Sequence, residues 1–468
     1  MLLSPVVLSA GTKIHLTQKL MAELIMQKSF KVLETDLKYE QNKLAPYQIK
    51  SAFDWKWALE SGYEIDKTES LAQIGDYRYE RYKTIGSISK SLLTGTVLNF
   101  DIARTSQKKD GDAFSLTSQT TSNQYTLDSW GVSVEQSLWG NSFGKSDYLK
   151  VRSADNLYKA QTIIRSDDLQ NVVLDGLRQY WNSYVAQENL KEAINSRDRY
   201  SKLVSSIQKK NSMGYTAPGE LNQILAEFES REQSVKNTSQ DFLKQSENLI
   251  TFLNLETNSE LNFEIPKSLP VLPEFKKMDP RQTRLIQSQE LKVTIAQDQL
   301  EEVTSRNKPN LNLVGKLSAT GLDETSTDSF NELSRGKNPK AYVGIKFSHT
   351  FGSDVHEAEY LNKKAALDLE KAKLQRMLKE FEDKQIQAYR KSQVTLQLVD
   401  SIKKQKEYRE RAMTELNRSY QQGRTDIRSL IDAMNNYFSM EVSYSRAVGD
   451  YFIAINEYIA LRDELIKD

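Results

Sequence analysis

Four segments of the chain alternate between apolar and polar residues. In the first of them, Lys50, Asp54 and Lys56 fall on one parity and the large apolar residues on the other. A period of two is typical of a β-strand with one apolar and one polar face, and each segment is about as long as a membrane-spanning strand, ~9–11 residues. We therefore predict four strands, each with one apolar and one polar face, which either span a membrane or pack their apolar face on a soluble core. The segments are 49–60, 130–139, 310–318 and 343–351.

The rest of the chain reads as long helices. Apolar residues recur at spacings of three and four in the range 143–212, and the range 354–421 contains neither Gly nor Pro. At ~1.5 Å per residue, helices of this length extend on the order of 100 Å and need coiled-coil partners. Residues 13–44 also read as helix, ending before Pro46. The pattern predicts a mainly α protein with long antiparallel helices and a smaller β portion.

The order helix, strand, strand, long helix, turn, helix occurs twice along the chain. Pro46 and Pro309 each lie between a helix and a strand, while Gly214 and Gly423 each end a long helix. This internal two-fold repeat defines four ranges: 1–12 as a signal-peptide remnant or a disordered start, 13–254 as the first repeat, 255–279 as a linker, and 280–468 as the second repeat. The first repeat carries an insertion at 63–125, which we expect to extend strands or to add a hairpin on the outer face.

Composition narrows the function classes. The 64 basic and 63 acidic residues are mixed along the chain, which gives no electrostatic footprint for nucleic acid. The absence of Cys removes disulfides, thiolate metal sites and a lipid-modified N-terminal Cys. His15, His349 and His356 are scattered, and no phosphate-binding loop occurs. We therefore predict no cofactor, no metal site and no enzymatic activity.

The most specific local motif runs from Tyr420 to Ala433. It reads Tyr420-Gln-Gln-Gly423-Arg-Thr-Asp-Ile-Arg-Ser-Leu-Ile-Asp432-Ala433 and resembles the Tyr-x-x-Gly … Leu-x-Asp-Ala signature of the TolC-type outer-membrane factor (outer membrane efflux protein) family. The stretch from Met213 to Ala226 is its counterpart in the first repeat. The resemblance covers nearly the whole chain. It implies a homotrimer with a coiled-coil barrel of helices, and four strands per protomer would then give a 12-stranded outer-membrane β-barrel, whose closure pairs every backbone group in lipid.

The resemblance also implies a function. It is that of a passive exit duct in a tripartite export system, located in the outer membrane and extending into the periplasm, for small-molecule efflux or type I secretion. The implied partners are two further copies of the chain, a periplasmic adaptor (membrane fusion) protein, an inner-membrane pump of the RND or ABC type, and outer-membrane lipid. The alternative from another class is a structural periplasmic coiled-coil protein without a pore.

Three groups of site residues follow by position. The expected lipid-facing strand residues are Phe53, Trp55, Trp57 and Phe347. The expected adaptor-contacting tips are Met213, Gly214, Tyr215, Thr216, Gln422, Gly423, Arg424 and Thr425. The expected periplasmic gate residues are Asp432, Ser429, Asp426, Glu220, Arg424, Arg428 and Tyr420.

Within the gate, Asp432 matches the second of two lumen-facing aspartates of the family. The first falls on Ser429, for which Asp426, a turn earlier, is the substitute. We expect Glu220 to pair with Arg424 or Arg428 and to hold the mouth closed. The alternative is that these residues are ordinary solvated helix charges and that the two tip glycines are plain helix C-caps.

Overall fold

The computed structural model divides the chain into two compact units. The residues that it describes are 13–67, 78–110, 124–256, 259–264, 268–352 and 354–466. The helical unit consists of Met1–Gln41, Gln161–Ser288 and Gln375–Asp468, and the sheet unit of Asn42–Ala160 and Gln289–Leu374. The start at 1–12, expected to be a signal remnant or disordered, lies outside the described residues, as does part of the insertion 63–125.

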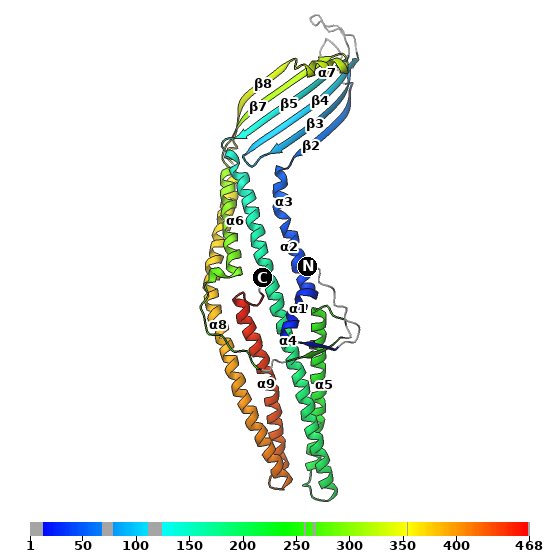
Figure 1. The fold of residues 1–468 in the computed structure, drawn as a ribbon, viewed down its shortest axis with the longest axis vertical. Helices are drawn as coiled ribbons and strands as arrows, with labels where there is room; N and C mark the ends of the chain where they lie inside the picture. Colours follow the sequence, from blue (N-terminus) through cyan, green and yellow to red (C-terminus); the bar gives the residue numbers. More distant parts are fainter. Residues whose placement is uncertain are drawn as a thin grey trace. The chain divides into compact units, whose positions relative to one another are not determined.

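The sheet unit is built on an antiparallel sheet in the order β2-β3-β4-β5-β7-β8 (Figure 1). Every pair of neighbours is antiparallel. The helix α7, Ser326–Ser334, joins β7 to β8 and packs on β5 and β7. The strands are β2 Lys56–Asp66, β3 Arg78–Ser91, β4 Thr96–Asp110, β5 Gln124–Ser137, β7 Asn310–Asp323 and β8 Pro339–Ser348.

Two strand predictions need correction. Four strands were expected, but the described sheet has six, because the insertion supplies the hairpin β3–β4 between β2 and β5. The first strand also begins later than expected. Residues Ala45–Lys50 form the helix α3 and Ser51–Phe53 form the 3-10 turn η1. Phe53 is therefore not a strand residue. Pro46 is the second residue of this short helix and lies in its first turn, where the fixed φ of proline is tolerated.

The two long helices are present as expected. They are α4, Lys145–Ser212, and α8, Asp354–Gln421, with 68 residues each. Each ends in a turn that leads to a second helix, α5 (Glu220–Phe252) or α9 (Ile427–Leu461). The helix α6, Arg284–Arg306, precedes β7. Short 3-10 turns are η2, Ser142–Gly144, and η3, Pro280–Gln282. No helix in the described part of the chain combines the length and the apolarity needed to cross a membrane.

The beginning of the chain differs from the single helix that was expected over 13–44. Residues Lys13–Leu16 form β1, which pairs in parallel with β6, Glu260–Phe263. Thr17 then caps the helix α1, Gln18–Lys28, by accepting the Leu20 N–H, and a second helix, α2, covers Phe30–Lys43. A capping threonine fixes where a helix begins, and it therefore separates the strand from the helix.

The core of the helical unit is aromatic. Trp181 is fully buried and stacks on Phe452 with ring centroids 3.8 Å apart and an interplanar angle of 8°. The neighbouring Tyr180 is also fully buried, and its hydroxyl donates to the carbonyls of Leu16 and Glu264. This side chain therefore ties β1 and the end of β6 to α4.

Candidate functional site

The two faces of the sheet differ in polarity over all six strands. Alternate residues point to opposite faces, so the strand register defines rows of side chains that cross the sheet. One such row is entirely apolar and consists of Trp57, Ile88, Phe100, Val132, Leu317 and Ala341. The adjacent row on the other face is Lys56, Ser89, Asn99, Ser133, Lys316 and Tyr342.

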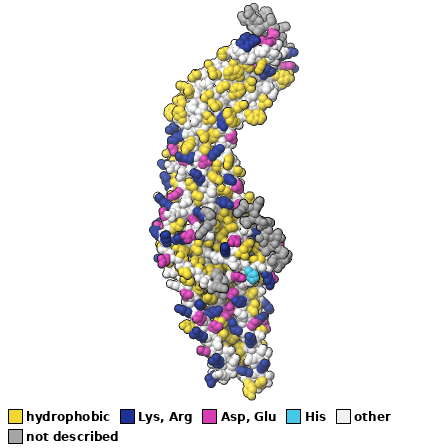
Figure 2. Space-filling view, in the orientation of Figure 1, with side chains coloured by type: hydrophobic (Ala, Val, Ile, Leu, Met, Phe, Trp, Pro, Cys, Tyr) yellow, Lys and Arg dark blue, Asp and Glu magenta, His cyan; other side chains and the backbone are white. Residues whose placement is uncertain are grey.

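The apolar face is exposed in the isolated chain. Hydrophobic side chains gather over the sheet in the space-filling view, whereas charged side chains are spread over the helical parts (Figure 2). Trp57 is 78% exposed and Phe347 is 57% exposed, and Trp55, just before β2, is also exposed. An exposed apolar surface of this extent marks a contact with lipid or with another protein.

The apolar face is bounded at the end of the sheet that carries α7. Tyr63 and Tyr82 pair there with ring centroids 4.4 Å apart. On the same face, Arg104 and Asp128 form an ion pair with a 2.7 Å N–O distance. Asp128 is almost fully buried, because α7 covers this end and the Ser329 hydroxyl accepts the Asp128 N–H. Charge therefore returns to this face in the row next to the pair of aromatic rings.

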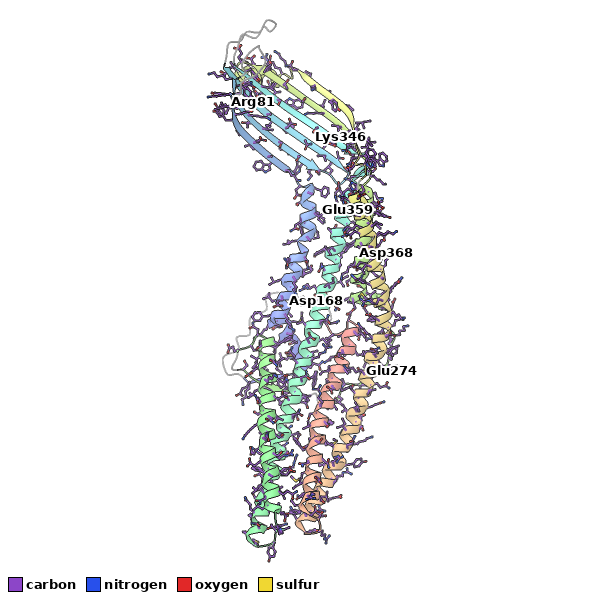
Figure 3. All side chains as sticks on the ribbon, turned by 180° about the vertical axis from the view of Figure 1, so that it is seen from behind. Arg81, Asp168, Glu274, Lys346, Glu359 and Asp368 are labelled. Carbon is purple, nitrogen blue, oxygen red and sulfur yellow. The ribbon has the colours of Figure 1, made fainter. Side chains whose placement is uncertain are left out.

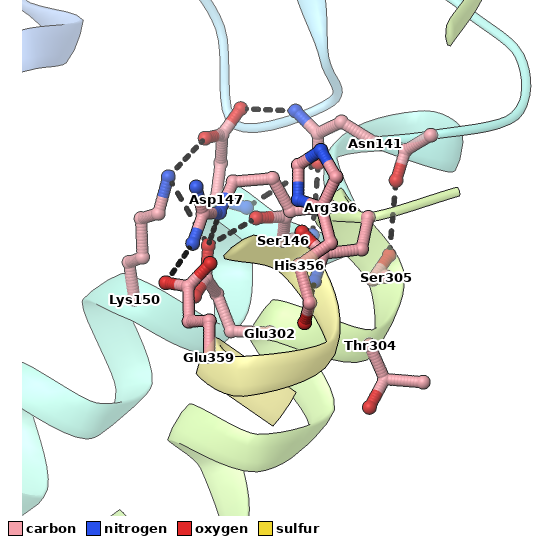
Figure 4. A network of polar contacts seen from close by, with 12 residues as sticks. Asn141, Ser146, Asp147, Lys150, Glu302, Thr304, Ser305, Arg306, His356 and Glu359 are labelled. Carbon is pink, nitrogen blue, oxygen red and sulfur yellow. Dashed lines mark hydrogen bonds and ion pairs between the residues drawn. The ribbon is translucent and has the colours of Figure 1, made fainter. Parts of the chain in front are cut away.

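A polar network lies at the opposite end of the sheet, where α4, α6 and α8 meet within the sheet unit (Figure 4). Asn141 accepts the Ser146 N–H at 2.8 Å, and the Ser146 hydroxyl donates to Glu302 at 2.9 Å. Arg306 then bridges Glu302 and Glu359. Lys346 of β8 lies toward this end and Arg81 of β3 toward the other (Figure 3). The network fixes the directions in which the helices leave the sheet.

The helical unit has two exposed turns, one after α4 and one after α8. Both turns are Schellman motifs, since the N–H of Tyr215 bonds to the Lys210 carbonyl and that of Arg424 to the Ser419 carbonyl, each at 2.9 Å. Gly214 and Gly423 have φ values of 78° and 71°, so they are helix C-caps.

The side chains of these turns are largely open to solvent. Met213 and Tyr215 are 67% and 79% exposed, Thr216 and Thr425 are partly exposed, and Gln422 and Arg424 are exposed. An apolar pair at the end of a hairpin is costly to leave in water. The first turn therefore exposes two large apolar side chains, whereas the second exposes polar ones.

Glu220, at the start of α5, has a different partner from the one expected. Its carboxylate accepts the hydroxyl of Tyr420 at 2.5 Å and the N–H of Ala217 at 3.1 Å. No ion pair of Glu220 with Arg424 or Arg428 occurs in the described part of the chain, and both arginines are exposed. At Glu220 the two hairpins are therefore linked by a tyrosine–carboxylate hydrogen bond.

Tyr420 is well placed for this role. It is 6% exposed, and the Lys210 ammonium lies 4.4 Å from its ring centroid. Burial, and then the hydrogen bond to Glu220, raises the pKa of Tyr420. The phenol is therefore protonated at neutral pH and can donate to Glu220.

The three residues expected in an axial ladder have different environments. Asp426 is the N-cap of α9 and accepts the Ser429 N–H at 2.7 Å, which lowers the pKa of Asp426. Asp432 is exposed on α9, and Ser429 between them is partly buried. Asp426 thus serves the helix start, whereas the Asp432 carboxylate faces solvent.

A buried charge pair in the helical unit was not found from the sequence. Glu441 of α9 is 3% exposed and forms an ion pair of 2.7 Å with Arg199 of α4. Arg199 also lies over the ring of Tyr437, 5.1 Å from its centroid. Burial, together with the nearby Glu192, raises the pKa of Glu441. The sequence feature that could have revealed this pair is an acidic residue, Glu441, on the apolar face of α9, four residues after Tyr437.

This pair predicts a pH dependence of stability. Because the pKa of Glu441 is raised in the folded state above the ordinary value of 4.5, the folded chain binds this proton more tightly than the unfolded chain. The free energy of unfolding should therefore increase as the pH falls from 7 toward 4.5, with a slope from this group of at most about 1.4 kcal/mol per pH unit. Urea unfolding between pH 7 and 4.5 measures it. Glu441→Gln should remove this increment, and an unchanged pH profile would contradict the assignment.

Comparisons with known proteins show which solved structures have a similar fold. No family model and no curated protein matches the sequence. Among solved structures, the chain is similar to the outer-membrane channel OprN, with a TM-score of 0.69, 14% identity and coverage of 95% of this chain and 89% of that one. It is also similar to the CmeC outer membrane channel of Campylobacter jejuni (0.71, 14%, 96% and 86%) and to the outer membrane protein VceC of Vibrio cholerae (0.68, 12%, 95% and 95%).

The fold is thus that of the outer-membrane channels. The resemblance to the TolC-type outer-membrane factors, read from the two turn motifs, is confirmed at the level of the fold.

Proposed function

We propose that the protein is the passive outer-membrane exit duct of a tripartite export system. The observation that carries this proposal is the sheet with one continuous apolar face and one polar face, in a chain with the fold of outer-membrane channels. The apolar face, including Trp57 and Phe347, meets lipid, and the polar face, including Lys56, lines water. An enzymatic role is no part of the proposal.

The working form of the duct is a homotrimer. A sheet with open edges cannot stay in a bilayer, because lipid offers no partner for unpaired backbone groups. Further copies of the same chain supply those partners. The helices then extend from the outer membrane into the periplasm and enclose the tunnel with those of the neighbouring copies.

The tips of the two hairpins meet a periplasmic adaptor. Support comes from the exposed Met213 and Tyr215 beside Gly214 and from the matching turn around Gly423. The sequence has no phosphate-binding Gly-Lys-Ser/Thr loop, so the energy for transport comes from a partner, an inner-membrane pump of the RND or ABC type. The pump also selects between small-molecule efflux and type I secretion, and the cargo is not a property of this chain.

The experiment that tests the channel is membrane fractionation followed by conductance measurement in a planar bilayer. We expect the protein in the outer membrane and stable single-channel currents after purification in detergent. A protein that stays soluble without detergent and gives no current would instead be a structural coiled-coil protein without a pore.

Asp432 is proposed as the residue that sets ion preference at the narrow end. Threefold symmetry turns one exposed carboxylate into a ring of three, which attracts cations and repels anions. Asp432→Asn should lower the cation-to-anion permeability ratio, measured from reversal potentials in a salt gradient. Asp426→Asn is the matched control, because asparagine still caps a helix. An equal effect of both substitutions would remove the special role of Asp432.

The Tyr420–Glu220 hydrogen bond is proposed as the latch of the closed mouth. Tyr420→Phe keeps the ring beside Lys210 and removes only the hydroxyl. A hydrogen bond to a charged group contributes about 1.5–3 kcal/mol, and three copies act together. Tyr420→Phe and Glu220→Gln should therefore both increase the open fraction in single-channel recordings. The double variant should open no more than either single variant; if the free-energy effects of the two single variants add in the double variant, the two side chains do not act through one bond.

A further inference from the structure

Resting on the proposed trimeric duct, we infer that each copy builds six strands into the membrane wall, so that the barrel has 18 strands and not 12. In this arrangement β2 of one copy pairs with β8 of the next. The hairpin β3–β4, which the sequence left as an extension or an appendage on the outer face, is then a lumen-lining part of the wall.

The side chains of the hairpin match this position. Ile88 and Phe100 continue the apolar row that runs from Trp57 on β2 to Val132 on β5. Behind them, Ser89 and Asn99 continue the polar row. A hairpin that lay on the outer face, or above the membrane, would have no reason to keep lipid-suited and water-suited faces in register with both of its neighbours.

The turn of the hairpin is also built into the base of the sheet. The Gly95 carbonyl accepts the Ser137 N–H at 3.0 Å, and the Thr94 carbonyl accepts the Gln136 side-chain amide at 2.9 Å. Gly144, just before α4, approaches so closely that a Cβ there would lie 1.8 Å from the Leu93 carbonyl oxygen. Only glycine permits this approach. The inserted turn is therefore fixed at the level where the sheet passes into helices.

The edges of the sheet are suited to a second copy of the chain. The five successive pairings are all antiparallel, so β2 and β8 run in opposite directions. In the described sheet each of these strands pairs on one side only. An antiparallel ladder between β2 and the β8 of a neighbour satisfies both edges and keeps each face on its own side. Every copy therefore adds six strands to the closed barrel.

The consequence concerns the size of the opening. Barrel diameter grows roughly linearly with strand number, so 18 strands give a diameter about 1.5 times that of 12 strands. Barrels of this strand number leave an aqueous channel. The duct would then impose its size limit below the membrane, where the helices narrow, and not in the membrane wall.

Cysteine labelling tests whether the hairpin belongs to the wall, and the absence of native cysteine gives a clean background. In native membranes, Ile88→Cys and Ile102→Cys should resist a water-soluble maleimide, as Val343→Cys on β8 should. The neighbours Ser87→Cys and Asn99→Cys, on the polar face, should react several-fold faster through the lumen. All five variants should react fully in urea. Equal labelling of the two faces of the hairpin in membranes would overturn the inference.

Disulfide cross-linking tests the edge pairing and the number of copies. Ala58→Cys on the polar face of β2 is combined in turn with Tyr342→Cys, Gly344→Cys or Lys346→Cys on the polar face of β8. At least one combination should give a covalent ladder that ends at three copies on a denaturing gel. Ala58→Cys with Ile345→Cys, on the opposite face, is the control and should not cross-link. A ladder that ends at two copies, or no cross-link in any combination, would overturn the 18-stranded barrel.

The two tests separate this inference from the function on which it rests. A protein that conducts ions while both faces of β3–β4 label equally is a channel with four strands per copy in its wall, and only the inference fails. A protein that gives no current and stays soluble removes the proposed function itself.

Discussion

Replacing Trp181 by alanine should destabilise the helical unit by about 3–5 kcal/mol, the usual cost of truncating a buried aromatic side chain. The indole is fully buried and stacks on Phe452, with Tyr180 and Tyr184 packed edge-on against it. Alanine removes this whole contact and leaves a cavity among α4, α9 and the strand β1. Chemical denaturation in detergent, followed by circular dichroism at 222 nm, measures the loss.

Trp181→Phe provides the matched control. The indole N–H has no hydrogen-bond partner within the described structure, so phenylalanine loses volume but no polar contact. It should cost less than half of the alanine value. Tyr215→Ala, at an exposed turn, should leave the unfolding curve unchanged. A small effect of Trp181→Ala would mean that the core can close around the gap.

Placing arginine on the apolar face of the sheet should impair membrane insertion. For Trp57→Arg or Phe347→Arg the cost is about 2–4 kcal/mol per copy if the residue lies near the bilayer midplane, and less toward the interface. Trp55→Arg, just before β2, should cost less than Trp57→Arg because it lies nearer that interface. The measurement is the fraction of protein that is folded and heat-resistant in outer-membrane extracts.

Lys56→Glu is the control next to Trp57 in sequence but on the other face. It should leave insertion intact and shift ion selectivity toward cations, because a carboxylate replaces an ammonium in the lumen. If Lys56→Glu and Trp57→Arg impair insertion equally, the assignment of the two faces is wrong.

The alternating segments located four of the six strands, and the insertion was expected only to extend strands or to add a hairpin on the outer face, because the period of β3 is weak. In β3, Ile85 falls on the polar face while Thr84 and Gly86 fall on the apolar face. Short polar residues on both faces hide a period of two. The face of such a strand is decided by its neighbours in the sheet, and single-sequence periodicity does not carry that information.

The start of the first strand was misplaced for a different reason, because the spacing of its apolar residues fits a helix as well as a strand. Ile49 and Phe53 are four residues apart, which fits one face of a helix as well as alternate positions of a strand. Pro46 was interpreted as a boundary between helix and strand. In the structure it opens another helical turn, and the strand begins only at Lys56.

In the candidate site, too, one part could be predicted from the sequence and another could not. The turn motifs fixed the two tips, because a Schellman turn needs glycine in the left-handed region, a requirement that is local in sequence. The partner of Glu220 was not local. It depends on how the start of α5 and the end of α8 approach each other, and Tyr420, a residue of the motif itself, takes the place that had been given to Arg424 or Arg428.

The position of the hairpin β3–β4 indicates how an antiparallel sheet that leads into helices can gain strands during evolution. Inserting a single strand after β2 would deliver the chain to the wrong rim of the sheet, so α4 could no longer begin where it does. Inserting two strands returns the chain to the same rim and leaves the loop from β5 to α4 untouched. A sheet with this topology can therefore gain strands only in pairs, as whole hairpins. In the proposed symmetric duct, each added hairpin would be multiplied by the number of copies.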